Sequence, residues 1–388
     1  MFSRGILLSK EIVGNWKTLL SASVFCAVLA ACESTPTHRP SITILPPQPR
    51  PAIVWPPPQP PVVVTPPQPR PPQPPVVVTP PQPPQPRPPI LQPPAYNAAI
   101  SGVQWVSLEA WGLAQARAQF ARLGAESDLT HLLRVNGTRL ELKADNRVVL
   151  CDGVRLWLAH APKLMKDHLY VHPLDIQKNL TPILSELPKN HRIVVIDPGH
   201  GGDSRGTQSV FNKAYEKEYT LDWALRLKPL LEAKGWKVHL TRTRDTAVSL
   251  AGRVAYADKV KANLFISLHF NSAASEHTGI ETYCITPVGM ASHMGRGAAD
   301  DTRTVLPNNA HDAPNIQYAA RVHSAMVGHV GMTDRGVRRV RFMDVLKSQK
   351  RPALLLEGGY LSSPEEARLV AMPEYRQKLA EGVAKALP

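Results

Sequence analysis

This chain of 388 residues has little cysteine: four residues in all. So few cysteines exclude a small scaffold built on disulfide bonds. Long apolar runs are also scarce. The apolar stretch at residues 19–31 covers thirteen residues, whereas a membrane-spanning helix needs about 20. With 43% hydrophobic and 20% charged residues, the chain is neither wholly disordered nor a polytopic membrane protein.

Acidic side chains are absent from residues 40–94, where proline dominates instead. Of the 40 prolines, 27 lie between Pro36 and Pro94, and residues 60–73 recur almost unchanged from Pro74 onward. Because proline fixes φ and removes a backbone donor, residues 32–95 are predicted to form a semi-rigid polyproline II spacer. The alternative is a ligand for a proline-reading module.

The first 31 residues are typical of a secretory signal peptide, because basic residues precede the apolar stretch. That stretch closes with Leu-Ala-Ala directly before Cys32. The pattern resembles a bacterial lipoprotein box, in which Cys32 becomes the lipidated first residue. Glu33 replaces the aspartate that marks inner-membrane retention, so the resemblance implies a periplasmic protein anchored to the outer membrane by its lipid. An ordinary signal peptide cut nearby is the alternative.

The middle segment, residues 96–190, is predicted to be a small β-rich or α+β accessory domain. Turn signals separate short alternating patches there, and one helix is expected around residues 113–123. Residues 135–182 loosely resemble the small module found at the N-terminus of copper amine oxidases. Four histidines lie here without ligand spacing and are interpreted as structural or solvated: His131, His160, His168 and His172.

From residue 191 to residue 388 the pattern predicts an α/β domain. Apolar runs at residues 193–196, 264–268 and 353–356 have the character of strands buried on both faces. Helical spacing occupies residues 218–234, where Pro229 predicts a kink or a restart. Strands that alternate with helices indicate a mostly parallel, twisted sheet with helices on both sides.

Three polar side chains follow three of these predicted strands: His200, His269 and Glu357. In an open parallel sheet the ligand crevice lies beyond the carboxyl ends of the strands, so these residues should converge. Two histidines are typical zinc ligands, and a catalytic zinc site takes a third protein ligand. Glu216 and Glu218 are both candidates for it. A carboxylate such as Glu357 could accept a proton from water and pass it to a leaving amine.

Several motifs in the same order resemble the zinc-dependent N-acetylmuramoyl-L-alanine amidases of the amidase-3 type. They lie at residues 196–202, 215–217, 249–257, 266–271, 279–283, 334–337 and 356–362. The resemblance implies one zinc ion held by His200, Glu216 and His269, with Glu357 as the catalytic carboxylate. It also implies peptidoglycan as the substrate and cleavage of the amide between N-acetylmuramic acid and L-alanine. Residues 203–207 depart from the family pattern, which commonly has an aspartate and a glycine-alanine pair there.

The formal charge of +14 does not indicate nucleic-acid binding, because no aromatic-basic platform is present and export would separate the chain from nucleic acid. Basic residues crowd residues 335–351, which are interpreted either as a surface for an anionic polymer or as a solvated face. The loop at residues 287–315 is expected to be open, with His293 and His311 on its surface. Two other functions stay open: a zinc carboxypeptidase and a non-catalytic peptidoglycan-binding lipoprotein. Any protein activator is unknown.

Overall fold

The computed structural model describes residues 97–388 except 116, 125–128, 189–191 and 295–299. The predicted signal peptide, Cys32 and the proline-rich spacer lie outside these residues, and so does the predicted domain boundary at residues 190 and 191. Within the described part of the chain, no helix is both long and apolar enough to cross a bilayer.

The N-terminal part of the described chain is rich in short antiparallel strands. A four-stranded sheet has the order β1-β2-β9-β8, and strands β3 to β7 form an antiparallel meander. The bounds are β1 (Asn97–Ile100), β2 (Val103–Ser107), β3 (Gln119–Leu123), β4 (Thr130–Val135), β5 (Thr138–Lys143), β6 (Val148–Cys151), β7 (Val154–Trp157), β8 (Lys163–Met165) and β9 (His168–Val171). The helical segments here are α1 (Leu108–Leu113), α2 (Pro173–Asp175), a π-helical turn (Ile176–Leu180) and α3 (Thr181–Ile183).

The helix expected around residues 113–123 is wrong. Helix α1 instead ends at Leu113, and its N-terminus is capped by Ser107, whose hydroxyl accepts a hydrogen bond from Ala110 N at 3.2 Å. The following segment forms β3, each residue of which pairs with β4. Tertiary pairing therefore outweighs the weak helical spacing of this short segment.

The C-terminal part is a mostly parallel sheet, as predicted. Its strand order is β11-β10-β12-β15-β13-β14, and the β13–β15 pair is its antiparallel junction. The strands are β10 (Ile193–Pro198), β11 (Lys237–Leu240), β12 (Leu264–Asn271), β13 (Ile280–Ile285), β14 (Asp334–Val340) and β15 (Ala353–Tyr360). The helices are α4 (Glu216–Glu232), α5 (Leu250–Lys259), a 3-10 turn (Pro307–His311), α6 (Asp312–Val330), α7 (Asp344–Lys347), α8 (Pro364–Ala371) and α9 (Pro373–Ala386).

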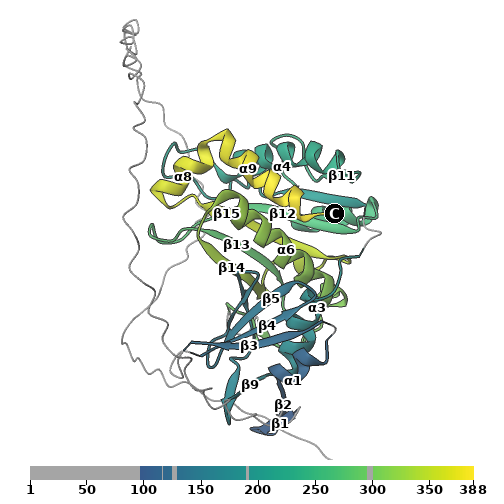
Figure 1. The fold of residues 1–388 in the computed structure, drawn as a ribbon. Helices are drawn as coiled ribbons and strands as arrows, with labels where there is room; N and C mark the ends of the chain where they lie inside the picture. The colour runs from purple at the N-terminus through teal and green to yellow at the C-terminus, as the bar shows by residue number, and fades with distance from the viewer. Residues whose placement is uncertain (1–96, 116, 125–128, 189–191, 295–299) are drawn as a thin grey trace, which may run out of the picture. The chain divides into compact units, whose positions relative to one another are not determined.

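Two apolar cores, one on each face, hold helices against this sheet. Alternate strand residues such as Ile196 and Ile266 pack with α4, α6 and α9, which Figure 1 shows lying together. Their neighbours Val195 and Phe265 pack on the opposite face with α5 and α7. The prediction of helices on both faces is thus confirmed. Helix α4 runs without interruption through Pro229 in its last turn, so of the kink or restart expected there the restart is wrong.

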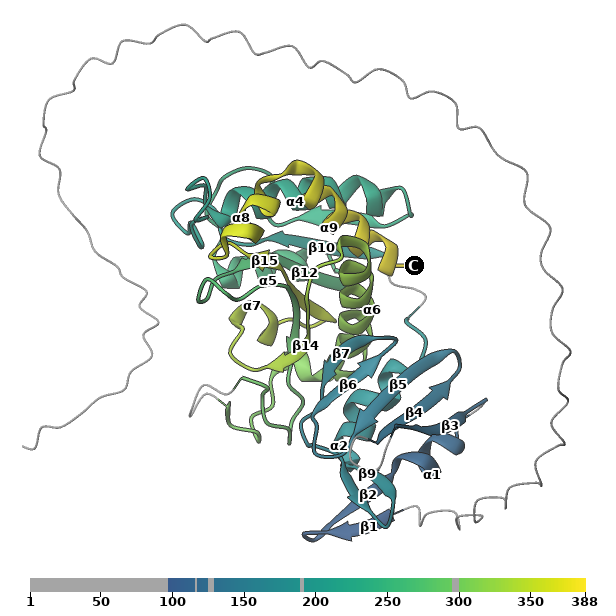
Figure 2. The ribbon, with the colours of Figure 1, turned by 60° about the vertical axis from the view of Figure 1, so that its left-hand side comes forward.

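The two parts of the described chain share one sheet. Strand β7 of the meander pairs in parallel with β14, where Leu156 lies opposite Val337, and an 11-stranded sheet results. Figure 2 shows the meander continuing from β14 through β7. The buried Arg339 of β14 reinforces the junction by donating to Asn179 Oδ1 at 2.8 Å.

Candidate active site

Three predicted ligands meet where the chain leaves β10, near the end of β12 and at the start of α4. His200 Nε2 lies 3.1 Å from Glu216 Oε2, and His269 Nδ1 lies 2.9 Å from Glu216 Oε1. One nitrogen or oxygen atom from each residue lies within 4.8 Å of the others, so the group could hold a metal ion. Two imidazoles and a carboxylate form a donor set that suits zinc.

The structure also separates the two candidates for the third ligand. Glu218 lies in the first turn of α4, where its Oε1 accepts a hydrogen bond from Tyr215 N at 3.0 Å. This is one half of a capping box, and it directs the Glu218 side chain to the backbone at the helix start. Glu216 points instead to the two histidines.

Glu216 is buried and surrounded by donors. Thr207 N donates to its Oε2 at 3.0 Å, and Phe270 N donates to its Oε1 at 3.1 Å. Burial alone would raise the pKa of this carboxyl, but the hydrogen bonds and charges of His200 and His269 lower it below its ordinary value. The carboxylate is therefore ionised and fixed in orientation.

Gly206 makes room for this cluster. Its φ of +71° lies in the left-handed region, and a Cβ there would come within 2.5 Å of Glu216 Oε2 and 2.7 Å of His200 Cδ2. The loop after the first histidine therefore passes directly against two of the three candidate ligands.

A buried network fixes the end of β10 just before the first histidine. Asp197 accepts hydrogen bonds from Thr241 Oγ1 at 2.5 Å and from Ser267 Oγ at 2.7 Å. Arg253 pairs with the same carboxylate and donates to His200 O at 2.7 Å. Hydrogen bonds from three segments thus place the turn that carries His200.

Glu357 lies beside this cluster on β15, directly opposite His269 in the sheet register and opposite Glu281 on its other side. Its side chain is buried, and its Oε2 has no hydrogen-bond partner among the described residues. Burial and the negative charges of Glu216 and Glu281 raise its pKa well above the ordinary value. A carboxyl of this kind is suited to holding a proton and releasing it.

Two residues that sequence reasoning missed border the cluster. Ser204 Oγ lies 3.0 Å from His200 Nδ1, so it holds the ring with Nε2 turned to Glu216. Arg205 lies over the Tyr215 ring at 5.2 Å and donates to the Tyr215 hydroxyl at 3.2 Å. The sequence feature that could have indicated both residues is the departure from the family pattern at residues 203–207.

His293 is half-buried instead of exposed on the surface, contrary to expectation. Its Nδ1 accepts from Arg339 N at 2.9 Å, and burial lowers its pKa well below the ordinary value, with Arg147 adding. His311 is the last residue of the 3-10 turn and directly precedes α6. It is half-buried, and burial lowers its pKa. Several basic residues of the 335–351 stretch are likewise buried and paired: Arg339 with Asn179, Arg341 with Asp300 and Arg351 with Asp258. The interpretation of that stretch as a solvated face is wrong for these three.

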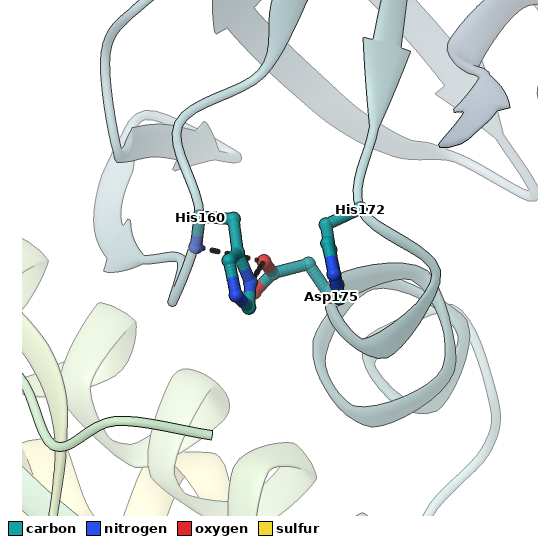
Figure 3. A group of neighbouring side chains, drawn as sticks. All are labelled: His160, His172 and Asp175. Carbon is teal, nitrogen blue, oxygen red and sulfur yellow. Dashed lines mark hydrogen bonds and ion pairs between the residues drawn. The ribbon is translucent and has the colours of Figure 1, made fainter. Parts of the chain in front are cut away.

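A second histidine group, His160 and His172 with Asp175, lies in the N-terminal part (Figure 3). The two imidazole rings are stacked, with centroids 3.7 Å apart and planes at 17°. Their in-plane lone pairs therefore run side by side instead of converging on one ion. Asp175 already accepts hydrogen bonds from Ala159 N at 2.8 Å and Asn179 Nδ2 at 2.7 Å. This arrangement favours the structural role predicted for these histidines.

The structure places a group of side chains that could hold a metal ion at one end of an α/β sheet, and comparison with known proteins gives the family. The family model described as N-acetylmuramoyl-L-alanine amidase, Amidase_3, matches residues 194–388, half of the chain. The chain belongs to this family.

The sporulation-specific N-acetylmuramoyl-L-alanine amidase of Bacillus subtilis is 33% identical over 196 residues, which cover 50% of this chain and 66% of that protein. This chain therefore spans just under two thirds of that relative's length. The germination-specific amidase of the same species is 27% identical over 216 residues, or 52% of this chain and 80% of that protein. The solved catalytic domain of CwlV from Bacillus (Paenibacillus) polymyxa is 32% identical. It covers 50% of this chain and 95% of its own, with a TM-score of 0.42.

Proposed function

We propose that this protein is a zinc-dependent N-acetylmuramoyl-L-alanine amidase. It hydrolyses the amide between the lactyl group of N-acetylmuramic acid and the L-alanine of the peptidoglycan stem peptide. The observation that carries the proposal is the contact of Glu216 with both His200 and His269, with Glu357 adjacent across the sheet. Family membership supports the same reaction.

The residues divide the chemistry between them. Zinc held by His200, Glu216 and His269 would polarise the scissile carbonyl and lower the pKa of water. Glu216 fixes both rings, and Ser204 keeps His200 Nε2 turned inward. The Glu357 carboxylate takes the proton from the attacking water and delivers it to the amine that leaves. Its burial keeps this proton away from bulk water.

The test uses the purified full chain, its zinc content and its action on purified peptidoglycan. We expect about one zinc per chain and released peptides that begin with free L-alanine. Glu357→Gln should lower release by at least about 100-fold while zinc content stays the same. The matched control is Glu218→Gln, which removes a nearby carboxylate outside the cluster and should keep most activity.

Three outcomes would contradict the proposal. Released products that lack an N-terminal L-alanine would indicate a carboxypeptidase. If Glu357→Gln releases peptides as fast as the wild type, Glu357 is not the residue that carries the proton. A wild-type protein that binds peptidoglycan but releases no peptide would favour the non-catalytic peptidoglycan-binding lipoprotein.

We also propose that the protein works in the periplasm, anchored through a lipid on Cys32. The support is the sequence alone: the apolar stretch and the residues around Cys32. Cys32→Ser should move the protein from the outer-membrane fraction to the soluble periplasmic fraction. Unchanged membrane association of that variant would contradict the anchor.

A further inference from the structure

We propose that Trp157, on strand β7 of the N-terminal meander, is a positioning residue for Glu357. It acts through Arg338 and the buried Glu281. This inference rests on the proposed function, because it concerns the same catalytic carboxyl. It assigns the N-terminal part an indirect role in the reaction, beyond tethering or binding.

Glu281 lies next to Glu357 and is tightly held. The two face each other across the antiparallel pair β13–β15, where directly opposite residues have Cβ atoms about 5 Å apart. Glu281 is 2% exposed. Its Oε2 accepts from Asn271 Nδ2 at 2.9 Å and from the Tyr283 hydroxyl at 2.6 Å. Asn271 closes β12 two residues after His269, so Glu281 also fixes the strand that carries a candidate ligand.

Two arginines of β14 neutralise Glu281. Arg335 Nε donates to Glu281 Oε1 at 2.9 Å, and Arg338 Nε lies 3.2 Å from the same oxygen. Burial alone would raise the pKa of Glu281, but Tyr283 and these arginines lower it below its ordinary value. If Glu281 loses one of its two cations, its buried charge beside Glu357 is less fully compensated, although Arg335 still pairs with it.

Trp157, on the neighbouring strand β7, contacts the side chain of Arg338 and the backbone of Arg335. The Arg338 guanidinium carbon lies 5.1 Å from the centroid of the Trp157 ring, a cation–π contact. The indole Nε1 donates to Arg335 O at 3.4 Å. Strand β7 approaches closely here, because a Cβ on Gly336 would come within 2.9 Å of Trp157 Nε1. The ring is therefore seated against the backbone between the two arginines.

The path is continuous: the indole contacts Arg338, Arg338 pairs with Glu281, and Glu281 lies opposite Glu357 in the sheet. Removal of the indole frees Arg338 to turn toward water. Glu281 then keeps its charge with one cation fewer, and the two carboxyl groups rearrange. Because a shift near 1 Å at a reacting group costs about 100-fold in rate, a partial shift should be measurable.

The first test compares Trp157→Ala and Trp157→Phe with the wild type on purified peptidoglycan. We expect Trp157→Ala to lower kcat about tenfold or more, with KM within about twofold and zinc content unchanged. Trp157→Phe keeps a ring face for Arg338 and should recover most of kcat. The control is Leu164→Ala, an exposed residue of the separate sheet on β8, which should leave kcat unchanged.

A second measurement does not depend on activity. The unfolding equilibrium is measured in urea for Trp157→Ala, Glu281→Gln and the double variant. If the indole acts through Arg338 on Glu281, the two single substitutions remove parts of the same interaction. The double variant will then be more stable than the sum of the two single losses of unfolding free energy predicts.

The possible results separate the two proposals. Wild-type protein that releases no peptide refutes the proposed amidase, and the urea measurement then still decides whether Trp157 and Glu281 are coupled. Active wild type with kcat unchanged in Trp157→Ala overturns the positioning role alone. The same conclusion follows if Trp157→Phe is as impaired as Trp157→Ala, or if the two single losses of unfolding free energy simply add in the double variant.

Discussion

Gly206→Ala should disable the candidate metal site without unfolding the protein. A Cβ at this position would lie 2.5 Å from Glu216 Oε2, whereas ordinary contact begins at 3.4 Å. The carboxylate or the loop must therefore withdraw by about 0.9 Å. His200 Cδ2, at 2.7 Å, must move as well. Because both histidines take their orientation from Glu216, the whole donor set should be displaced.

The backbone strain of this substitution has a matched control. Gly331 has a φ of +70°, close to the +71° of Gly206, but a Cβ there meets nothing within 4 Å. Both alanines therefore carry the cost of a left-handed residue, about 1 to 2 kcal/mol. Only Gly206→Ala adds the contact with Glu216 and His200.

The assay is zinc affinity, measured by competition with a chelator, together with urea unfolding of both variants. Loss of a partner that orients a metal ligand typically costs about 10- to 100-fold in affinity, and we expect that range for Gly206→Ala. Gly331→Ala should keep wild-type affinity, and Gly206→Ala should lose more stability than Gly331→Ala because of the added overlap while remaining folded. Equal zinc affinity in the two variants would refute the assignment of this cluster as the metal site.

Three further predictions follow from other parts of the described chain. Arg205 has no ion-pair partner among the described residues, so Arg205→Ala should raise KM about fivefold for stem peptides with free carboxylates. An equal rise in KM for stem peptides whose carboxylates are amidated would contradict the idea that Arg205 binds a carboxylate. Burial, with Arg122 and His168 adding, lowers the pKa of His131 to about 4. The folded state thus keeps this ring neutral while the unfolded chain takes up a proton below about pH 6.5. The free energy of unfolding should be highest above that pH and fall by about 3 kcal/mol as the pH drops to 4. In urea titrations at several pH values, His131→Leu should show a weaker fall than the wild type. An equal fall in the two proteins would contradict the prediction. Burial, with Asp152 adding, raises the pKa of Cys151 to about 12. A thiol reagent at pH 8 should therefore modify Cys151 only after unfolding, as mass spectrometry of its peptide would show; labelling of the native protein would be the opposite result.

The positions of His200, His269 and Glu357 could be predicted because they depend on a simple rule. Buried apolar runs identify strands, and the carboxyl ends of parallel strands meet. The α/β fold followed from the same alternation of strands and helices, and the structure confirms it. These features depend on local patterns that the sequence states directly.

Other features depend on contacts between distant residues. The choice between Glu216 and Glu218 is decided by a capping box that only the helix start reveals. The segment at residues 119–123 becomes a strand because β4 pairs with it along its whole length. Arg339 looked like part of a charged surface, but its partner Asn179 lies 160 residues away. Charge and spacing alone contain none of this information.

The shared sheet has a consequence for any attempt to shorten the protein. Residues 154–157 protect the outer side of β14, so a chain lacking them would expose that strand's backbone as an open edge. Such edges are templates for pairing with other chains and promote aggregation. The isolated amidase-family segment should therefore be less soluble than the longer chain, even though it contains every candidate ligand and the proposed catalytic carboxyl.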